Sequence, residues 1–131
     1  MTIERSNPAG LHPTPGYHHV TTVEASRLVF LAGQCPLAPD GALAEGGLAG
    51  QTAQVIDNIL TALESAGARP ADVVRTVIYV ASPDRDELAA VWTQLNESSL
   101  APAFTTASTL LGVAQLGFPG QLVEIDVTAA L

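Results

Sequence analysis

The chain has 131 residues, of which 47% are hydrophobic, and carries a formal net charge of -8 at pH 7. This length suits one domain with its own core, residues 1–131, rather than two domains. Nucleic-acid binding depends on clustered lysine and arginine, and this chain has five arginines and no lysine, so we expect no nucleic-acid partner.

The amino terminus and the lone cysteine indicate a cytoplasmic protein. Residues 1–5 lack the charged-then-apolar order of a signal peptide. Cys35 has no second cysteine with which to form an intramolecular disulfide. No apolar run approaches the roughly 18 residues that a membrane span requires, so we also expect no membrane partner.

Prolines and glycines dominate the beginning of the chain. Residues 6–18 hold three prolines and two glycines, which predicts an irregular segment. Two candidate strands follow, residues 19–24 and 27–33, and the short connection between them predicts an antiparallel hairpin. Residues 35–47, again rich in proline and glycine, are predicted to form a loop.

The middle of the chain predicts two helices around a strand. Apolar residues recur at three- and four-residue spacings over residues 48–66, which is typical of an amphipathic helix, and Gly67 is placed to end it in a left-handed conformation. Residues 73–81 are β-branched and aromatic and predict a buried strand. Ser82 and Pro83 then predict the start of a second helix, with the hydroxyl as cap and the proline at the first helical position.

The last third of the chain predicts two further strands. Residues 104–116 alternate weakly, residues 117–120 form a turn, and residues 122–127 form the last strand. The order of elements favours an α+β fold in which both helices cover one face of the sheet. Self-association is then the natural way to bury the other face.

The last strand places two carboxylates in an apolar run. Glu124 and Asp126 share one face because side chains alternate along a strand. A carboxylate in such a run must be solvated, hydrogen-bonded or neutralised by a cation, yet no positive side chain follows Arg85. Two interpretations stay open for Glu124, an exposed carboxylate near a strand edge and a pocket residue that orients water. For Asp126 we favour solvation.

The other chemical candidates favour structural roles. His12, His18 and His19 predict no metal site, because adjacent histidines of a strand point to opposite faces and no nearby Cys or Asp completes a ligand set. Ordinary histidines are favoured over a proton donor. Cys35 has no basic neighbour in sequence and is predicted to be a packed thiol, and Trp92 on a helix face is usually part of a core.

Five segments occur in one order along nearly the whole chain, namely residues 15–17, 31–34, 51–67, 72–76 and 122–126. Together they resemble the RidA/YjgF family of reactive-intermediate deaminases. The resemblance implies a chorismate-mutase-like α+β fold, with two helices on one face of a mixed sheet. It also implies a homotrimer with small-molecule pockets between subunits.

The resemblance also implies a chemistry. Family members with deaminase activity hydrolyse enamines and imines such as 2-aminoacrylate to 2-oxo acids without a cofactor. An arginine holds the substrate carboxylate and a glutamate positions water. By register Glu124 matches that glutamate and is the expected catalytic residue. The positions expected to bind substrate are Tyr17, Ala32, Gly33, Trp92 and Ser108, with Ala32 in place of a serine and Trp92 in place of an asparagine.

The substrate-binding arginine is missing from this sequence. Counting from Pro102 puts Phe104 in its place, whereas counting back from Glu124 puts Ser108 or Thr109 there. Three hypotheses follow: hydrolysis of an enamine or imine that lacks the usual carboxylate, a non-catalytic ligand-binding or regulatory trimer, and an ordinary 2-aminoacrylate deaminase with an arginine from elsewhere. The arginines available for the third hypothesis are Arg5, Arg27, Arg75 and Arg85.

Overall fold

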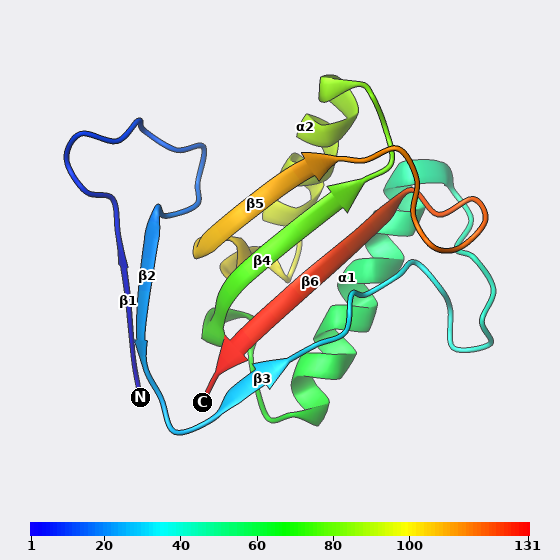
Figure 1. Ribbon diagram of the computed structural model, residues 1–131. Coiled ribbons are helices and arrows are strands. Elements are labelled where there is room, and N and C mark those ends of the chain that lie inside the picture. The colour runs from blue at the N-terminus through cyan, green and yellow to red at the C-terminus, as the bar shows by residue number, and fades with distance from the viewer.

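The computed structural model describes residues 1–131 and contains six strands, two α-helices and two short 3-10 helices (Figure 1). The strands are β1 (Thr2–Ser6), β2 (Val20–Glu24), β3 (Leu28–Phe30), β4 (Val73–Val80), β5 (Ala107–Gly112) and β6 (Val123–Ala130). The helices are α1 (Gly47–Ser65), α2 (Arg85–Asn96), η1 (Pro70–Asp72) and η2 (Ala101–Phe104).

The main sheet has four strands in the order β3-β6-β4-β5. The pair β4 and β5 is parallel and the other two pairs are antiparallel, so the sheet is mixed. Both helices pack on the same face of this sheet, as Figure 1 shows. The predicted α+β architecture with two helices on one face is confirmed. Neither helix is both long enough and apolar enough to span a bilayer.

The core lies between that sheet face and the two helices. The side chains of Ile78 on β4 and Ile125 on β6 are fully buried there, and Ile59 of α1 meets them from the other side. Each such side chain contributes about 1.5–3 kcal/mol relative to its exposed state. Because residues of β6 alternate between buried and half-buried, Glu124 and Asp126 face away from the core. The prediction that these two carboxylates share one face is confirmed.

The predicted hairpin between residues 19–24 and 27–33 is wrong. β2 pairs with β1, a strand that the sequence pattern did not predict, and β3 pairs with β6. A two-residue hairpin turn requires positive φ angles, and no residue other than glycine has one in this chain. Instead, the amides of Ser26 and Arg27 donate to the carbonyl of Leu131 at 3.1 and 2.9 Å, which carries the chain from one sheet to the other.

The ribbon of β1 and β2 is anchored to the main sheet by polar contacts. The guanidinium of Arg5 donates to the carbonyls of Ala71 and Val73 at 3.2 and 2.9 Å. The hydroxyls of Thr21 and Thr106 lie 2.7 Å apart. These contacts hold the irregular loop between β1 and β2 beside the start of β5.

The observed ends of α1 agree with the prediction to within one residue, whereas the observed start of α2 differs from the prediction. α1 differs from the predicted range by one residue at each end, and Gly67 follows it with a φ of 76°. α2 begins after the predicted start, because the carboxylate of Asp84 caps it by accepting from the amide of Asp86 at 2.8 Å. The hydroxyl of Ser82 instead accepts from the amide of Asp84, so the predicted Ser82 cap is wrong.

The strand predicted over residues 104–116 is shorter in the structure. β5 covers only Ala107–Gly112. Phe104 ends η2 and is fully buried, with its ring centroid 6.1 Å from that of Trp92. Pro102 suits the first turn of a helix, and the buried aromatic ring keeps this segment in a turn rather than a strand.

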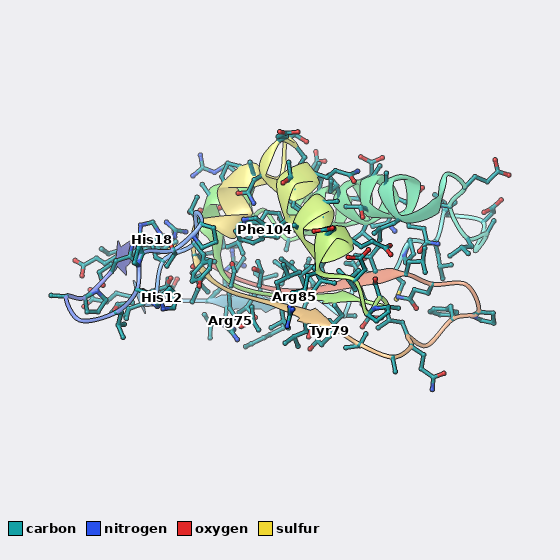
Figure 2. All side chains as sticks on the ribbon, turned by 90° about the horizontal axis from the view of Figure 1, so that it is seen from above. His12, His18, Arg75, Tyr79, Arg85 and Phe104 are labelled. Atoms are coloured by element: carbon teal, nitrogen blue, oxygen red, sulfur yellow. The ribbon has the colours of Figure 1, made fainter.

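One face of the sheet is left without a covering layer. Figure 2 shows Arg75 and Tyr79 on the side away from the helices and Phe104 on the helix side. Apolar side chains are exposed on this open face: Leu28 at 56%, Phe30 at 72% and Leu111 at 40%. Within one chain this face is therefore uncovered, and its covering by a second copy stays a prediction.

Candidate functional site

The carboxylate of Glu124 is held through one of its two oxygens. The thiol of Cys35 and the side-chain amide of Gln121 both donate to Oε1, each at 3.1 Å. No hydrogen bond reaches Oε2. Glu124 is half-buried on the open face, so its second oxygen is available to a ligand or to water. We call Gly33, Cys35, Gln121 and Glu124 the carboxylate site.

Gly33 lies directly against this carboxylate. A Cβ at this position would come within 2.4 Å of Oε2 of Glu124 and 3.0 Å of Oδ1 of Asp126. Such contacts do not occur between real atoms, so any side chain at Gly33 would push the carboxylates away. The close approach therefore requires glycine.

A β-bulge brings these residues together. Phe30 pairs with Thr128, whereas Gln34 pairs with Ile125, so four residues on one segment oppose three on β6. Continuing the second register puts Gly33 opposite Asp126 and Cys35 opposite Glu124. Ala32 lies within the bulge with an exposed side chain, and its carbonyl accepts from the side-chain amide of Gln34 at 3.0 Å.

The neighbours of the two carboxylates are protonated donors. Burial, together with the hydrogen bond to and the negative charge of Glu124, raises the pKa of the Cys35 thiol to about 11. Burial and the negative charge of Asp126 raise the pKa of Tyr79, whose hydroxyl donates to Asp126 at 3.2 Å. Asp126, expected to be solvated, is thus hydrogen-bonded. Neither carboxylate forms an ion pair, because the only salt bridge joins Arg69 and Asp72.

A second group of candidate residues lines an apolar pocket of about 430 Å³ between the β1–β2 loop, α2 and β5. The lining residues are Pro15, Tyr17, Arg85, Leu88, Ala89, Trp92, Ser108 and Leu110. We call it the edge pocket. The indole of Trp92 donates to the carbonyl of Pro15 at 3.2 Å, and its ring meets that of Tyr17 edge to face at 6.2 Å. Three predicted substrate-binding residues, Tyr17, Trp92 and Ser108, therefore come together.

The edge pocket and the carboxylate site lie on opposite sides of the sheet. Ser108 faces the helices, where its hydroxyl accepts from Thr76 at 2.6 Å. Glu124 faces the open side. Within one chain the structure thus does not join Tyr17, Trp92 and Ser108 with Gly33 and Glu124.

The structure distinguishes the three positions considered for the missing arginine. Phe104 is in the core, and Thr109 is on the open face, where its hydroxyl accepts from Arg75 at 3.0 Å. Only Ser108 lines the edge pocket. The same pocket contains Arg85, its only charged lining residue, which forms no salt bridge.

The histidines gather near Tyr17 in the β1–β2 loop, where Figure 2 shows His12 and His18. The ring of His12 lies 3.3 Å from the Tyr17 hydroxyl and packs edge to face on His19, with centroids 4.6 Å apart. His18 contacts the carbonyl of Thr105 through Nδ1. No group of three or more His, Cys, Asp or Glu side chains has the arrangement of a metal site.

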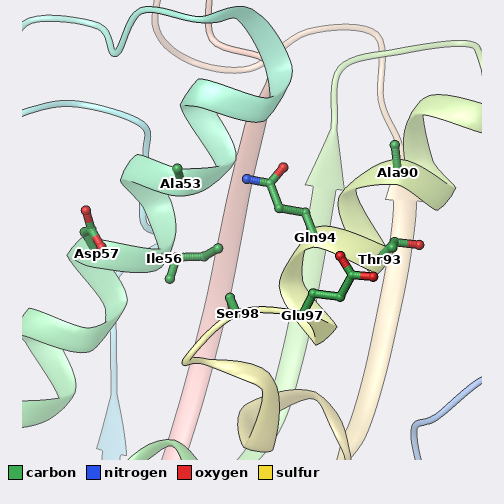
Figure 3. A pocket seen from close by; sticks show the side chains of 8 residues that line it. All are labelled: Ala53, Ile56, Asp57, Ala90, Thr93, Gln94, Glu97 and Ser98. Atoms are coloured by element: carbon green, nitrogen blue, oxygen red, sulfur yellow. The ribbon is translucent and has the colours of Figure 1, made fainter.

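The largest hollow on the chain lies elsewhere. A groove of about 670 Å³ runs between α1 and α2, and Figure 3 shows its lining. It contains none of the residues singled out from the sequence. Its lining residues are Ala53, Ile56, Asp57, Ala90, Thr93, Gln94, Glu97 and Ser98.

Comparison with known proteins places this arrangement in a family. The family model described as Endoribonuclease L-PSP matches residues 9–131. A crystal structure of a Rid-family protein from Yersinia pestis superimposes over 100% of both chains, with a TM-score of 0.90 and 35% sequence identity. The chain belongs to the Rid/YjgF family.

Curated Rid relatives match over shorter stretches. A RutC family protein of Pyrococcus abyssi is 36% identical over 69 residues, which are 52% of this chain and 54% of that protein. The 2-iminobutanoate/2-iminopropanoate deaminase of Escherichia coli K12 is 30% identical over 80 residues, 60% of this chain and 59% of the deaminase. The chain thus spans between about half and three fifths of the length of these relatives.

Two residues of the carboxylate site were not predicted to belong to it. Cys35 was predicted to be a packed thiol, yet it donates to Glu124, and Gln121 was not assigned to any site. Arg85 was one of four arginines considered for the pocket, and of these four it is the one that lines the edge pocket. The two-residue spacing of Gly33 and Cys35 was a usable signal, because residues so spaced along an extended segment lie on the same face of the sheet. No sequence signal places Arg85 near Ser108.

Proposed function

We propose that this Rid-family chain hydrolyses a C=N bond in a pocket formed between two copies of itself, with Glu124 orienting the attacking water. The observation that carries this proposal is the carboxylate of Glu124, held at Oε1 by two donors and unpartnered at Oε2 above Gly33. The name of the Escherichia coli relative, an imine deaminase, supports the same chemistry.

The positions of the two sites support assembly between copies. The edge pocket supplies Tyr17, Trp92 and Ser108 on the helix side, whereas the carboxylate site opens on the other side of the sheet. One copy therefore cannot offer both to one small molecule. The exposed Phe30 on the open face gives a second copy an apolar surface to cover. A closed homotrimer would join each carboxylate site to a neighbour's edge pocket.

The reaction needs only water and a positioned base. Glu124 accepts a proton through Oε2 while the water oxygen bonds to the imine carbon and the C=N π electrons pass to nitrogen. Glu124 then returns the proton to nitrogen, which gives a carbinolamine. The hydroxyl proton of the carbinolamine passes to nitrogen by way of Glu124, the C–N bond breaks, and ammonia leaves as the carbonyl forms. Imine plus water thus gives carbonyl compound plus ammonia, and the enzyme is unchanged. No cofactor takes part in this scheme.

The substrate of the first candidate lacks a carboxylate. Support for it comes from β5, which offers the neutral hydroxyl of Ser108 and no guanidinium to the edge pocket. A single neutral hydrogen bond is a weak substitute for a two-pronged charged contact. The apolar lining, with Leu88, Trp92 and Leu110, suits a hydrophobic body.

A second candidate is an ordinary deaminase of carboxylate-bearing imines such as 2-iminopropanoate. The observation that favours it is Arg85, an unpaired guanidinium from α2 in the edge pocket. Comparing hydrolysis of neutral imines and 2-imino acids by the wild type and by Arg85→Gln separates the two candidates. If only the 2-imino acid reaction is lost in the variant, Arg85 is the carboxylate partner.

The main test is substitution of Glu124. Glu124→Gln should abolish imine hydrolysis while the fold is retained, and Glu24→Gln on β2, far from both sites, should leave turnover unchanged. Unchanged turnover in Glu124→Gln would reject the proposed role. A wild-type chain that hydrolyses no imine, but is thermally stabilised by a metabolite, would instead favour the non-catalytic trimer.

A mixing experiment tests the shared pocket. Glu124→Gln chains should be inactive alone, and Trp92→Ala chains should bind substrate too weakly to turn it over when the substrate is dilute. At that substrate concentration, activity should return when the two chains are unfolded and refolded together. Random mixing in a closed trimer leaves about a quarter of the pockets with both halves intact. No recovery, with mixed trimers present by native mass spectrometry, would mean that both halves come from one chain.

An unpaired cysteine suits a reducing compartment such as the cytoplasm, which we propose as its location. We propose no ribonuclease activity, although the family model is described as an endoribonuclease, because a chain with a net charge of -8 offers little to a phosphate backbone.

A further inference from the structure

We propose that Cys35 and Gln121 are positioning residues, which occupy Oε1 of Glu124 and so leave Oε2 as the one oxygen that binds and deprotonates water. This inference rests on the proposed function. It assigns roles to two residues that lie outside the sequence segments on which the family resemblance is based. A free carboxylate rotates readily about its last bond, and its two oxygens are then equivalent. Two donors on one oxygen remove that equivalence.

Gln121 is fixed because both N–H donors and the oxygen of its side-chain amide are hydrogen-bonded. Its side chain is only 4% exposed. The amide nitrogen donates to the carbonyl of Val123 and to Oε1 of Glu124, each at 3.1 Å, and the amide oxygen accepts from the backbone of Phe118 at 3.1 Å. A buried amide with every partner in place has no alternative rotamer of equal energy. The donor to Glu124 is therefore held in one direction.

The two loops that carry these donors are both tied to α1. Asn58 of α1 donates to the carbonyl of Cys35 at 2.9 Å. Gln51 of the same helix donates to the carbonyl of Gly120 at 2.9 Å and accepts from the amide of Leu122 at 2.7 Å, on either side of Gln121. One rigid helix thus sets the positions of both donors relative to β6. This is the support that a precisely aimed catalytic group needs.

Cys35 keeps its proton under ordinary conditions. Its thiol has a pKa raised to about 11, so it acts as a donor and not as a nucleophile across the physiological range. A serine at this position would still donate, whereas alanine and valine would not. Valine retains the bulk of the side chain, which separates loss of the donor from loss of packing.

Kinetics of four variants test the positioning role. Cys35→Ala and Cys35→Val should lower kcat about tenfold with KM within about twofold, because the water is misdirected while the substrate pocket is intact. Cys35→Ser should recover most of the loss, and Ser65→Ala on the exposed side of α1 should match the wild type. Wild-type kcat in Cys35→Val, or a Cys35→Ser as slow as Cys35→Ala, would overturn the inference.

A second measurement does not depend on turnover. Because Cys35 is the only cysteine, the S–H stretching band in the infrared spectrum is assignable to it. We expect this band to move to higher frequency in Glu124→Ala, and the pKa of the thiol to fall from about 11 toward 9.0. An unmoved band would overturn the inference even in an active enzyme. If the band moves but the wild-type chain hydrolyses no imine, the hydrogen bond from Cys35 to Glu124 is supported and the proposed function is rejected.

Discussion

The carboxylate site and the edge pocket are built in different ways. The carboxylate site depends on strand register, a bulge and hydrogen bonds from the half-buried thiol of Cys35 and the buried side-chain amide of Gln121, so its atoms have one arrangement. The edge pocket depends on aromatic contacts between a loop and a helix, and it contains Arg85, a flexible side chain with no ion-pair partner. Under the proposed function, the first site would fix the chemistry, while the second would be free to change what is recognised.

The largest loss of activity is expected when the tightest contact of the carboxylate site, between Gly33 and Glu124, is disrupted. In Gly33→Ala the new Cβ would lie 2.4 Å from Oε2 of Glu124, so the carboxylate must move. We expect imine hydrolysis to fall about 100-fold, which corresponds to about 2.7 kcal/mol in the transition state. Circular dichroism should show an unchanged fold.

Gly117→Ala is the matched control for this change. Gly117 has ordinary φ, and a Cβ there would meet nothing within 4 Å. Its activity should equal that of the wild type. A Gly33→Ala enzyme as active as Gly117→Ala would mean that the approach of Gly33 to Glu124 has no catalytic role.

The next prediction concerns the interface that would join the carboxylate site of one copy to the edge pocket of another. Phe30→Asp places a charge on the open face, where Phe30 is 72% exposed, and burying that charge would be costly. If the wild type forms the proposed trimer in light scattering, we expect this variant to lose it, and to lose hydrolysis with it. Phe118→Asp, at another exposed aromatic in the turn before β6, should remain assembled. A trimeric Phe30→Asp would exclude the open face as the interface.

A smaller effect is expected in the edge pocket. Trp92→Phe removes the hydrogen bond to the carbonyl of Pro15 and keeps an aromatic ring near Tyr17. We expect KM to rise about fivefold with kcat nearly unchanged, because only binding is weakened. Steady-state kinetics on the best imine substrate would measure both. A fall in kcat with constant KM would contradict the division between the two sites.

The smallest effect concerns stability at high pH. The raised pKa of Cys35 means that the folded chain holds its proton more tightly than the unfolded chain does. Its contribution to stability is present below about pH 9 and is lost as pH rises toward 11. Tyr79, whose pKa is also raised, acts in the same direction. Urea unfolding at about pH 8 and about pH 11 should show a smaller loss for Cys35→Ala than for the wild type.

The sequence predicted the parts of the fold that depend on local patterns. The spacing of apolar residues predicted α1, and alternation correctly put Glu124 and Asp126 on one face. Those patterns work because burial on one side of a helix or strand selects for them. The pairing of β2 with β1 could not be predicted in the same way, since strand pairing depends on contacts between distant segments.

The grouping of the candidate site residues could also be predicted only in part from the sequence. Tyr17, Trp92 and Ser108 do line one pocket, and Gly33 does lie against Glu124. Their separation onto two sides of the sheet follows from the orientation of β5 and β6, which no local motif carries. Arg85 lines the edge pocket because the turn after β4 brings the start of α2 beside β5, so its place depends on tertiary packing.

The unpaired carboxylates of β6 have a consequence for how copies come together. Each chain carries a formal charge of -8, and Glu124 and Asp126 lie on the same face as the apolar side chains that a neighbour would cover. Like charges approaching one another oppose association at low ionic strength, and dissolved ions screen that repulsion over roughly 10 Å at 0.1 M. Dilution into salt-free buffer should therefore loosen the assembly, and moderate sodium chloride should tighten it.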